Sequence, residues 1–455
     1  MREVLKEEKM ETYDVIVLGG SAAGITAAIT ARRFNPDKKI LVIRKEEKVL
    51  IPCGIPYIYG TVGSTDKNLI PDAVLEKNNI DLMIGNVEKI DRSGKTVLTD
   101  KNSTVGYDKL IISTGSDPMI PPIAGSDKDN VFTVKKDDKY LTELLEKVDE
   151  SRNMVIIGGG FIGMEFADEC KKNRDIDITV VEMLPHCLML VFDEEFCKQG
   201  EDLIMERGVK VLTGEKVEEI TGNSKVEGIK LSSGKKIEAD LVLIGIGASS
   251  NSKVAIDSGI EVNEKGSIVV DKYMGTNDEN IFACGDCCEK FSFFTKKPVN
   301  LMLASIATNE ARIAGANLYK INRTNEGVIG AYSTVIGDTA LARAGMSERE
   351  AQDNGYDIVV GMAEGPNCHP GCMPGGSNLK VNLVFEKGSG IILGGQLIGA
   401  KSGGELINLI SGCICKKMTA DDIATFQMGT HPALTASPIA YQISNAAEMA
   451  VKQLG

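Results

Sequence analysis

The chain lacks three features that would assign it to a membrane, exported or nucleic-acid-binding class. No run reaches the roughly 18 consecutive apolar residues that a membrane-spanning helix needs. The N-terminal stretch MREVLKEEKMETYD is charged and has no apolar targeting core, so we expect a cytoplasmic protein. A net positive charge is also missing, because the formal charge is −13, which argues against nucleic acid or an anionic membrane as a partner.

Histidine is scarce in this chain, whereas cysteine is not. There are 3 histidines and 11 cysteines in 455 residues, a length that predicts two or three domains. In a cytosolic chain, this many cysteines are mostly free thiols rather than a disulfide framework. Cys53 lies between Pro52 and Pro56 in IPCGIPYIYG, and no second cysteine follows it closely. This stretch alone leaves four roles open for Cys53: a packed thiol, half of a disulfide, a metal ligand or a nucleophile.

Two glycine-rich segments each join a predicted strand to a predicted helix. The first, YDVIVLGGSAAGITAAITARRF, begins at Tyr13. Such a turn places free backbone N–H groups and the positive end of a helix where a pyrophosphate can bind. Gly19 permits the tight turn and Gly24 lets the helix approach the strand, whereas Ser21 replaces the middle glycine of the G-x-G-x-x-G pattern.

The second segment, NMVIIGGGFIGMEFADEC, has the complete pattern in Gly158, Gly160 and Gly163. The next predicted strand ends at Glu182, whose carboxylate can accept hydrogen bonds from both hydroxyls of an adenosine ribose. The same charge repels a 2′-phosphate, and Met183 offers that phosphate no cationic partner. The second segment therefore favours NADH over NADPH.

The first segment is predicted to hold a different dinucleotide, because Arg44 stands where an acidic ribose ligand is common. Flavin and nicotinamide form the chemically natural pair, since a flavin can accept a hydride and pass electrons on singly or in pairs. A third glycine segment, NIFACGDC, places Asp286 at a turn where it can bind a ribityl hydroxyl. Two more predicted strands, in YDKLIISTGSDP and ADLVLIGIGASSN, also end in glycine turns.

The pattern of apolar and polar residues changes from about residue 330 onwards. YSTVIGDTALARAGMSEREA and NLKVNLVFEKGSGIILGGQLIGA alternate with period two around turn glycines, which predicts an antiparallel sheet. Helical stretches follow, and no phosphate-binding loop is present. An α+β region of this kind more often builds an interface than catalyses alone.

These segments, in this order, resemble the pyridine nucleotide–disulfide oxidoreductases from Tyr13 to the C-terminus. PCGIPY is similar to the single-cysteine branch, which includes NADH oxidases, NADH peroxidases and coenzyme A–disulfide reductases; a Cys-x-x-x-x-Cys pair would need a cysteine where Ile58 stands. The resemblance implies two Rossmann-like dinucleotide-binding domains and a C-terminal α+β dimerisation domain that forms a homodimer. The expected division is a flexible extension at 1–12, an FAD-binding domain at 13–130 and 255–328, an NAD-binding domain at 131–254, and the dimerisation domain at 329–455.

The resemblance also implies functional residues. Cys53 matches the redox cysteine, and Asp286 matches the aspartate that holds the flavin ribityl chain. We predict no metal site. The cofactor-binding residues that we predict for FAD and NADH are Gly19, Gly20, Ser21, Ala22, Gly24, Arg44, Lys45, Thr114, Gly115, Gly158, Gly160, Phe161, Ile162, Gly163, Glu165, Glu182, Gly247, Gly285 and Asp286.

A thiolate beside an oxidised flavin can form a charge-transfer pair, and we expect a lowered pKa to make Cys53 a nucleophile. Without a resolving cysteine, its oxidised form is a sulfenic acid, a mixed disulfide or a persulfide, depending on the oxidant. We expect an FAD enzyme that oxidises NADH and reduces a small sulfur substrate, which is a coenzyme A-type disulfide, a persulfide or a polysulfide. Two alternatives are an NADH oxidase or peroxidase, and a reductase of a protein electron acceptor that does not need Cys53.

Some positions depart from the coenzyme A–disulfide reductases. Pro52 replaces an asparagine that often precedes the redox cysteine, and Cys372 and Met373 stand where tyrosines are expected. Arg32 and Arg33 match a segment where a coenzyme A phosphate could bind, although a solvated helix face explains them equally well.

The segment CHPGC, residues 368–372, has three interpretations. Its two cysteines and its histidine could bind a metal, although three ligands in a tight loop do not usually close a site. Cys368 and Cys372 could instead form a second redox pair that relays electrons to a neighbouring Cys53. The third interpretation is a turn with incidental thiols.

His431, in GTHPALTASP, resembles the histidine that acts as an acid–base group across the dimer in two-cysteine relatives. Ala436 replaces the glutamate that orients it there. The alternative is a hydrogen-bonded residue at the start of a helix.

Overall fold

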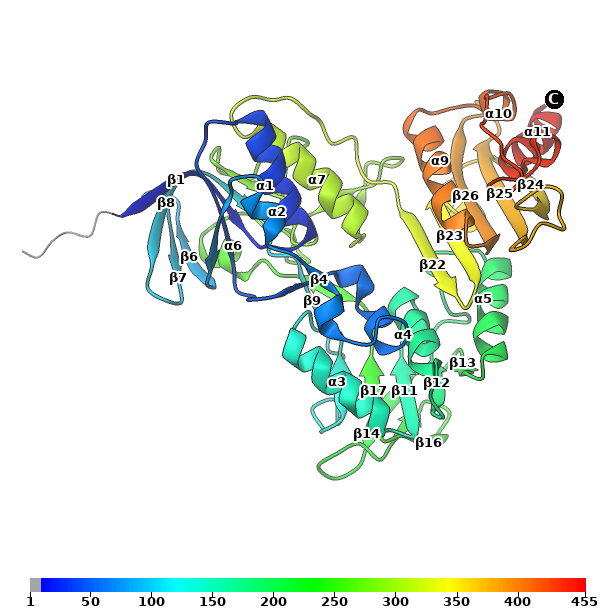
Figure 1. The fold of residues 1–455 in the computed structure, drawn as a ribbon, viewed down its shortest axis with the longest axis horizontal. Coiled ribbons are helices and arrows are strands. Elements are labelled where there is room, and N and C mark those ends of the chain that lie inside the picture. Colours follow the sequence, from blue (N-terminus) through cyan, green and yellow to red (C-terminus); the bar gives the residue numbers. More distant parts are fainter. Residues whose placement is uncertain (1–9) are drawn as a thin grey trace, which may run out of the picture.

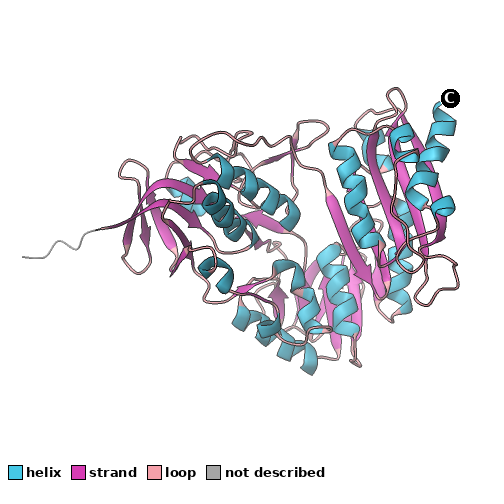
Figure 2. Ribbon diagram, turned by 45° about the horizontal axis from the view of Figure 1, so that its top comes forward, coloured by secondary structure: helices cyan, strands magenta, loops and turns pink. Residues whose placement is uncertain are grey.

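The computed structural model describes residues 10–455, which form three α/β units around three main sheets (Figures 1 and 2). The predicted fold class, two dinucleotide-binding units followed by an α+β domain, is confirmed. Among the described residues, no helix is both long and apolar enough to cross a membrane.

The first sheet has seven strands, and its centre is parallel. Its strand order is β5-β2-β1-β8-β7-β6, and β19 pairs with β8 although it lies far along the chain. These strands are β1 (Glu11–Leu18), β2 (Ile40–Arg44), β5 (Asp81–Ile84), β6 (Val87–Asp91), β7 (Thr96–Thr99), β8 (Thr104–Ile112) and β19 (Ile281–Ala283). Helices α1 (Ala22–Phe34) and α7 (Ala304–Asn317) lie side by side against this sheet (Figure 1).

The apolar runs of β1, β2 and β8 are buried on both faces, as expected for central strands of a parallel sheet. Most of the flexible extension expected at 1–12 falls outside the described residues. Its last part needs a correction, because Glu11 and Thr12 belong to β1 and pair with Val105 and Gly106 of β8.

The second sheet is entirely parallel, in the order β10-β17-β11-β12-β13. Its strands are β10 (Val131–Thr133), β11 (Asn153–Ile157), β12 (Asp177–Val181), β13 (Lys210–Leu212) and β17 (Leu241–Ile244), with helices α3 (Asp138–Glu150), α4 (Phe161–Lys171) and α5 (Glu194–Glu206). A small antiparallel sheet follows, made of β14 (Val217–Thr221), β15 (Gly228–Leu231) and β16 (Lys236–Glu238). The chain passes between the first two units through β9 (Ser116–Pro118) and β18 (Ala248–Ser250), which pair antiparallel.

The third sheet is antiparallel, as its period-two pattern predicted, in the order β22-β23-β26-β25-β24. It contains β22 (Ala331–Ile336), β23 (Thr339–Gly345), β24 (Ile358–Pro366), β25 (Asn378–Glu386) and β26 (Ile392–Ala400). Helices α8 (Glu348–Asp353), α9 (Gly403–Cys415), α10 (Ala420–Ala424) and α11 (Gln442–Leu454) complete this C-terminal domain. Helix α9 packs on β23 and β26, and α11 packs on β24 and β25.

The segment that carries Cys53 leaves the first unit and packs against the second. It contains β3 (Val49–Leu50), the short 3-10 helices η1 (Pro52–Gly54), η2 (Pro56–Tyr59) and η3 (Thr65–Lys67), and β4 (Leu69–Ile70). The Tyr59 ring lies 4.8 Å from that of Phe166 on α4, and its hydroxyl donates to Leu141 O at 3.1 Å. This packing fixes η2 against α4, and η1 directly precedes η2 in the chain. The remaining short elements are α2 (Ala73–Glu76), α6 (Lys253–Asp257), β20 (Lys290–Phe291), β21 (Pro298–Val299) and η4 (Pro438–Ala440).

Candidate active site

The first glycine loop lies between β1 and α1, and only glycine fits two of its positions. Gly19 has φ +109°, and a Cβ there would overlap Ser113 O. A Cβ on Gly24 would overlap Gly19 O, so the helix approaches the strand as the sequence predicted. Ser21 does not cap α1 with its side chain, and the first N–H groups of a helix have no partner within it. The loop therefore presents donors that fit a pyrophosphate.

The second glycine loop repeats this geometry between β11 and α4. Gly158 has φ +107°, and a Cβ on Gly163 would overlap Gly158 O. By contrast, a Cβ on Gly160 would meet no atom of the described chain within 4 Å. Gly160 is thus open to a ligand, and no side chain caps the helix that it begins. This loop also fits a pyrophosphate.

Glu182 follows β12 and is held against the second loop. Its Oε2 accepts from Gly159 N at 2.7 Å, and its Oε1 accepts from Leu184 N at 2.8 Å. Each carboxylate oxygen can accept a second hydrogen bond. The predicted negative charge therefore lies beside the loop, although backbone groups of the chain already bind it.

Arg44 is bound by groups of the chain itself. Its guanidinium donates to both carboxylate oxygens of Asp72, at 2.6 and 2.9 Å, and its Nε donates to Glu46 O at 2.8 Å. The side chain is 1% exposed, so its charge is neutralised inside the protein. Its stem lies under the first loop, since a Cβ on Gly20 would overlap Arg44 Cδ. Lys45 is more than half exposed and lies 3.9 Å from a Glu46 carboxylate oxygen.

The strand ends predicted as cofactor contacts meet at the junction of the first two units. Thr114 donates its hydroxyl to Asn251 O at 2.5 Å. Gly115 and Gly247 both adopt positive φ, at +72° and +112°. Ser116, at the start of β9, donates its hydroxyl to Asp286 Oδ2 at 2.9 Å.

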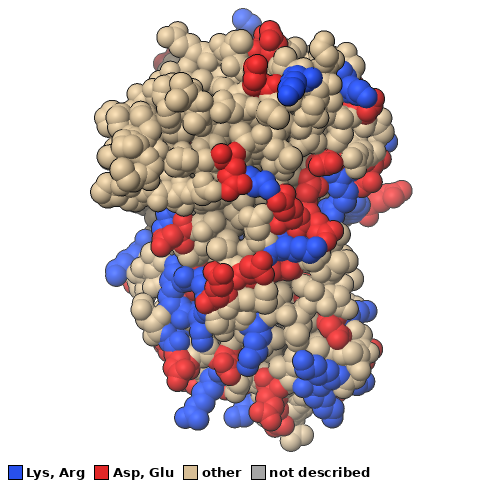
Figure 3. All heavy atoms as spheres, turned by 90° about the vertical axis from the view of Figure 1, so that its right-hand side faces the viewer, with Lys and Arg blue, Asp and Glu red and all other residues tan. Residues whose placement is uncertain are grey.

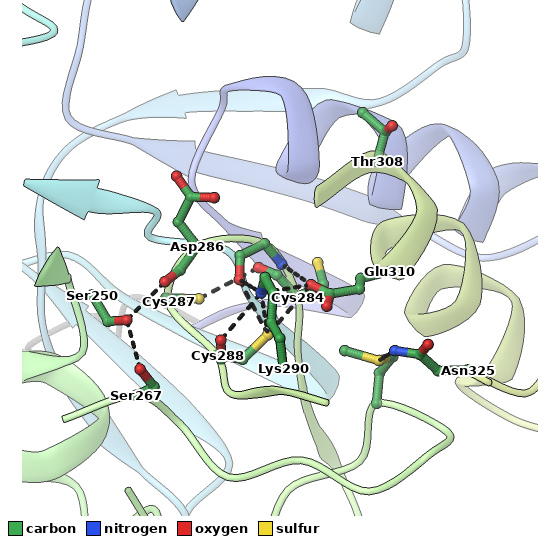
Figure 4. Close-up of polar contacts among 12 residues, drawn as sticks. Ser250, Ser267, Cys284, Asp286, Cys287, Cys288, Lys290, Thr308, Glu310 and Asn325 are labelled. Atoms are coloured by element: carbon green, nitrogen blue, oxygen red, sulfur yellow. Dashed lines mark hydrogen bonds and ion pairs between the residues drawn. The ribbon is translucent and has the colours of Figure 1, made fainter. Parts of the chain in front are cut away.

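Asp286 stands on the turn after β19, close to the first loop. Gly285 before it has φ +83°, and a Cβ there would lie 2.9 Å from the Cβ of Ala23 in α1. The Asp286 carbonyl accepts from Ser250 Oγ at 2.8 Å. Figure 4 shows the Asp286 carboxylate directed away from the buried side chains beneath the turn.

Cys53 lies on η1 as an exposed free thiol. A Cβ on its neighbour Gly54 would overlap Asn68 Oδ1, and the Asn68 amide donates to Ile51 O at 3.0 Å. These contacts hold the loop that presents the thiol. Ile58, which stands where a second cysteine would be, is fully buried in the apolar cluster shared with α4.

The electrostatic surroundings of Cys53 differ from the expectation of a lowered pKa. Partial burial raises the pKa of its thiol, and the Glu165 and Asp286 carboxylates raise it further, whereas the Lys136 ammonium lowers it. Groups from three distant parts of the chain therefore surround this residue. The chain's own groups favour the neutral thiol, so a lowered pKa would need a positive or electron-poor group supplied by a cofactor.

Glu165 is the most perturbed carboxyl group near Cys53. Burial raises its pKa to about 7; the hydrogen bond from Thr334 opposes this shift, and the charge of Glu169 adds to it. Thr334, on β22 of the C-terminal domain, donates to Glu165 Oε1 at 2.7 Å. The Glu165 charge also helps burial to raise the pKa of Tyr57 to about 12. A carboxyl group that titrates near neutral pH can hold or release a proton here.

Phe161 and Ile162 are the first two residues of α4. The Phe161 ring stacks on Tyr332 of β22, with centroids 5.6 Å apart and an interplanar angle of 18°. Ile162 is exposed. Lys136, Thr334 and Tyr332 were not predicted as site residues, because no motif marks them and their positions depend on how the three units pack.

His431 caps its own turn rather than a helix. Its Nδ1 accepts from Ala433 N at 3.2 Å, and its carbonyl accepts from Leu434 N at 3.0 Å. His369 N donates to Pro432 O at 2.9 Å, so the CHPGC loop lies beside the His431 turn. Within residues 10–455, no hydrogen bond joins His431 to Cys53.

The thiols of the CHPGC loop are free; Cys368 is buried and Cys372 is exposed. In the part of the chain that the structure describes, no group of three or more His, Cys, Asp or Glu side chains could hold a metal ion. For Arg32, the sequence left open a contact with a coenzyme A phosphate. In the structure, its guanidinium donates to the carbonyls of Pro36, Lys38, Asn78 and Asn79. It is thus committed to the protein backbone rather than to a phosphate.

Comparisons with known proteins agree with this geometry. The family model "Pyridine nucleotide-disulphide oxidoreductase" matches residues 13–311, and the model "Pyridine nucleotide-disulphide oxidoreductase, dimerisation domain" matches residues 332–439. The chain is 30% identical over 450 residues to an NADH oxidase of Methanocaldococcus jannaschii, covering 96% of this chain and 99% of that protein. It is 30% identical over 400 residues to an NAD(P)H sulfur oxidoreductase (CoA-dependent) of Pyrococcus furiosus, covering 86% and 89%. Among solved structures, it is similar to an NAD-dependent persulfide reductase from A. fulgidus, with a TM-score of 0.88, 31% identity, and coverage of 97% and 83%.

Proposed function

Since the chain belongs to the pyridine nucleotide-disulphide oxidoreductase family and is therefore an FAD-dependent NAD(P)H oxidoreductase, we propose that it reduces a small sulfur compound at Cys53. The substrate class is a coenzyme A-type disulfide, a persulfide or a polysulfide. The observation that carries this proposal is the lone exposed thiol on η1, with a buried Ile58 where a resolving cysteine would stand. Oxidised Cys53 cannot close a disulfide within its own segment, so it forms an adduct with the oxidant.

The two glycine loops divide the cofactors between them. The first loop, with Gly285 and Asp286 beside it, holds FAD in this proposal. The second loop, with Glu182, holds NADH, and the Glu182 charge disfavours the 2′-phosphate of NADPH. FAD held by the first loop and Asp286 would supply two-electron transfer between NADH and the sulfur adduct.

The residues of the chain then carry out a thiol–disulfide exchange. The Cys53 thiolate attacks one sulfur of R–S–S–R′, which forms Cys53–S–S–R and releases R′–S⁻. Two electrons from NADH cleave the adduct and return the Cys53 thiolate and R–SH. The overall reaction, NADH + H⁺ + R–S–S–R′ → NAD⁺ + R–SH + R′–SH, balances in atoms and electrons.

Glu165 is proposed as the group that holds the proton for this exchange. Its pKa of about 7 leaves it partly protonated at neutral pH, and only its Oε1 is bonded to Thr334. Because its charge reaches both Cys53 and Tyr57, it lies close enough to influence the thiol. His431 is the other proton-donor candidate, and it would have to act on the active site of a partner subunit.

A homodimer is part of the proposal. The C-terminal domain exposes large apolar side chains at Met362, Leu434, Ile439 and Met449, with Ile439 89% exposed. Figure 3 shows a broad area of the upper half of the molecule with few charged side chains. A surface of this kind is typical of an interface, and the match to the dimerisation-domain model supports a second copy as its partner.

A second candidate function is that of an NADH oxidase or peroxidase. The M. jannaschii protein, which matches nearly the full length of this chain, is named an NADH oxidase. In that reaction, oxygen or peroxide would convert Cys53 to a sulfenic acid. A reductase of a protein acceptor is the third candidate, and it predicts that Cys53 is dispensable.

Steady-state NADH consumption distinguishes these functions. The purified FAD-loaded protein is mixed anaerobically with NADH and with coenzyme A disulfide, a polysulfide or hydrogen peroxide in separate reactions. The proposal expects rapid turnover with at least one sulfur compound and at least a tenfold slower rate with peroxide or, in a parallel aerobic reaction, with air. Rapid turnover with peroxide or air alone would replace the proposal with the oxidase or peroxidase.

A further inference from the structure

A buried ion pair lies directly beneath the turn that carries Asp286 (Figure 4). Lys290, on β20, and Glu310, on α7, are 4% and 0% exposed. The Lys290 Nζ and Glu310 Oε2 atoms are 3.1 Å apart. The two residues come from different segments and meet on the far side of the turn from the Asp286 carboxylate.

The pair binds both polar backbone atoms of one residue, Gly285. Gly285 N donates to Glu310 Oε2 at 2.9 Å, and Gly285 O accepts from Lys290 Nζ at 2.7 Å. Lys290 Nζ also donates to Cys288 O at 3.1 Å, two residues beyond Asp286. The backbone on each side of Asp286 is therefore fixed by charge-assisted hydrogen bonds, which are stronger than neutral ones.

A buried ion pair is an expensive way to hold a turn if stability is all that it provides. Removing two charges from water is energetically costly, and apolar replacements of the same size are often no less stable. The pair is also imperfectly satisfied, since Glu310 Oε1 is buried and accepts no hydrogen bond from any residue in 10–455. Both facts indicate that the position of the bonded backbone matters more than the net stability.

The turn has little freedom to move in any other way. Gly285 has φ +83°, which glycine adopts without strain, and a Cβ there would lie only 2.9 Å from the Ala23 Cβ at the start of α1. Ser116 Oγ donates a hydrogen bond to the Asp286 carboxylate at 2.9 Å. A displacement of Gly285 would therefore change both the first glycine loop and the direction of the Asp286 carboxylate.

We propose that Lys290 and Glu310 are positioning residues for the flavin, because their buried ion pair clamps the Gly285 peptide and thereby fixes Asp286 towards the ribityl chain. This inference rests on the FAD role that the proposed function gives to Asp286. Neither residue touches the cofactor in this account. Their contribution passes through the two hydrogen bonds to Gly285.

The test measures FAD binding to the full-length apoprotein, by quenching of flavin fluorescence, together with the fine structure of the visible flavin band. Lys290→Met and Glu310→Gln each remove one charge and keep the approximate shape. Because a single variant leaves an unpaired buried group and risks misfolding, Lys290→Met/Glu310→Leu replaces the whole pair with apolar side chains. Asn325→Ala is the matched control, since Asn325 bonds Met274 Sδ and Gly327 N in the same region but does not contact Gly285.

The double variant is expected to fold with an unchanged far-ultraviolet circular dichroism spectrum and to bind FAD at least tenfold more weakly. The visible absorption band of its bound flavin should lose its fine structure. Asn325→Ala and the wild type are expected to bind FAD equally well. A folded double variant with wild-type FAD affinity and band shape overturns the inference, as does an Asp286→Ala variant that binds FAD normally. Because no NADH or sulfur compound is present, a failure of the proposed substrate class would leave these results unchanged.

Discussion

Thr334 of the C-terminal domain donates a hydrogen bond to Glu165 on α4, the helix that follows the second glycine loop, at 2.7 Å. This bond links the domain that matches the dimerisation model to the carboxyl group whose charge reaches Cys53. A change in the packing of the C-terminal domain would therefore alter proton availability at the thiol.

Thr334→Val tests this link. The hydrogen bond favours the charged carboxylate and so lowers the pKa of Glu165; its loss should raise that pKa above the present value of about 7. A hydrogen bond to a charged group contributes about 1.5 kcal/mol, which corresponds to about one pH unit. The pH profile of kcat/KM for NADH-dependent reduction should shift towards alkaline pH by about that amount. Thr334→Ser keeps the hydroxyl and should restore the profile; an unshifted valine variant would exclude Glu165 as the titrating group.

Glu165 should also make stability depend on pH. Its pKa is higher in the folded protein, about 7, than the ordinary value of 4.5, so the folded state binds its proton more tightly. The free energy of unfolding should therefore fall as the pH rises from about 4.5 to 7, by at most about 3 kcal/mol. Glu165→Gln should remove this loss and gain stability relative to the wild type at pH 8, measured by urea denaturation. Equal wild-type and variant midpoints at both pH 5 and pH 8 would contradict the burial argument.

Gly160→Ala separates ligand binding from folding. Its backbone φ of −74° suits alanine, and a Cβ there meets nothing within 4 Å. The melting temperature should stay within about 2 °C of the wild type, because surface changes without clashes cost little. The KM for NADH should rise at least tenfold, since the added methyl group occupies the space where the pyrophosphate approaches. Gly163→Ala is the contrasting variant, because its Cβ would overlap Gly158 O and should destabilise the fold.

Coenzyme preference should follow the charge at Glu182. Glu182→Gln keeps an acceptor for Gly159 N but removes the charge. This variant should lower the ratio of kcat/KM for NADH to kcat/KM for NADPH. Glu182→Ala with Met183→Arg should favour NADPH, because a guanidinium pairs well with a 2′-phosphate. Met183→Arg alone should change the ratio of the two kcat/KM values much less. If all three variants keep the wild-type ratio, the second loop does not bind the adenosine ribose in the proposed way.

Local spacing was enough to predict both glycine loops, the acidic end of β12 and the lone thiol, because each depends on residues close together in the chain. The antiparallel C-terminal sheet followed from its period of two. The bonds of Arg44 to Asp72 and of Thr334 to Glu165 could not be predicted, since they join residues 28 and 169 positions apart. The same holds for the raised pKa of Cys53, which depends first on its partial burial and then on carboxylates brought to it from α4 and from the turn after β19.

Cys53 is the proposed redox group for a sulfur substrate. An anaerobic NADH titration of the FAD-loaded protein, followed by visible absorbance and by addition of polysulfide, tests this proposal directly. We expect the wild type to show a long-wavelength charge-transfer band while the Cys53 thiolate lies beside oxidised flavin, and the NADH-reduced protein to be reoxidised rapidly by polysulfide. Both should be lost in Cys53→Ser. A Cys53→Ser protein that is reoxidised at the wild-type rate would contradict the proposal and leave Cys53 without a role in the reaction.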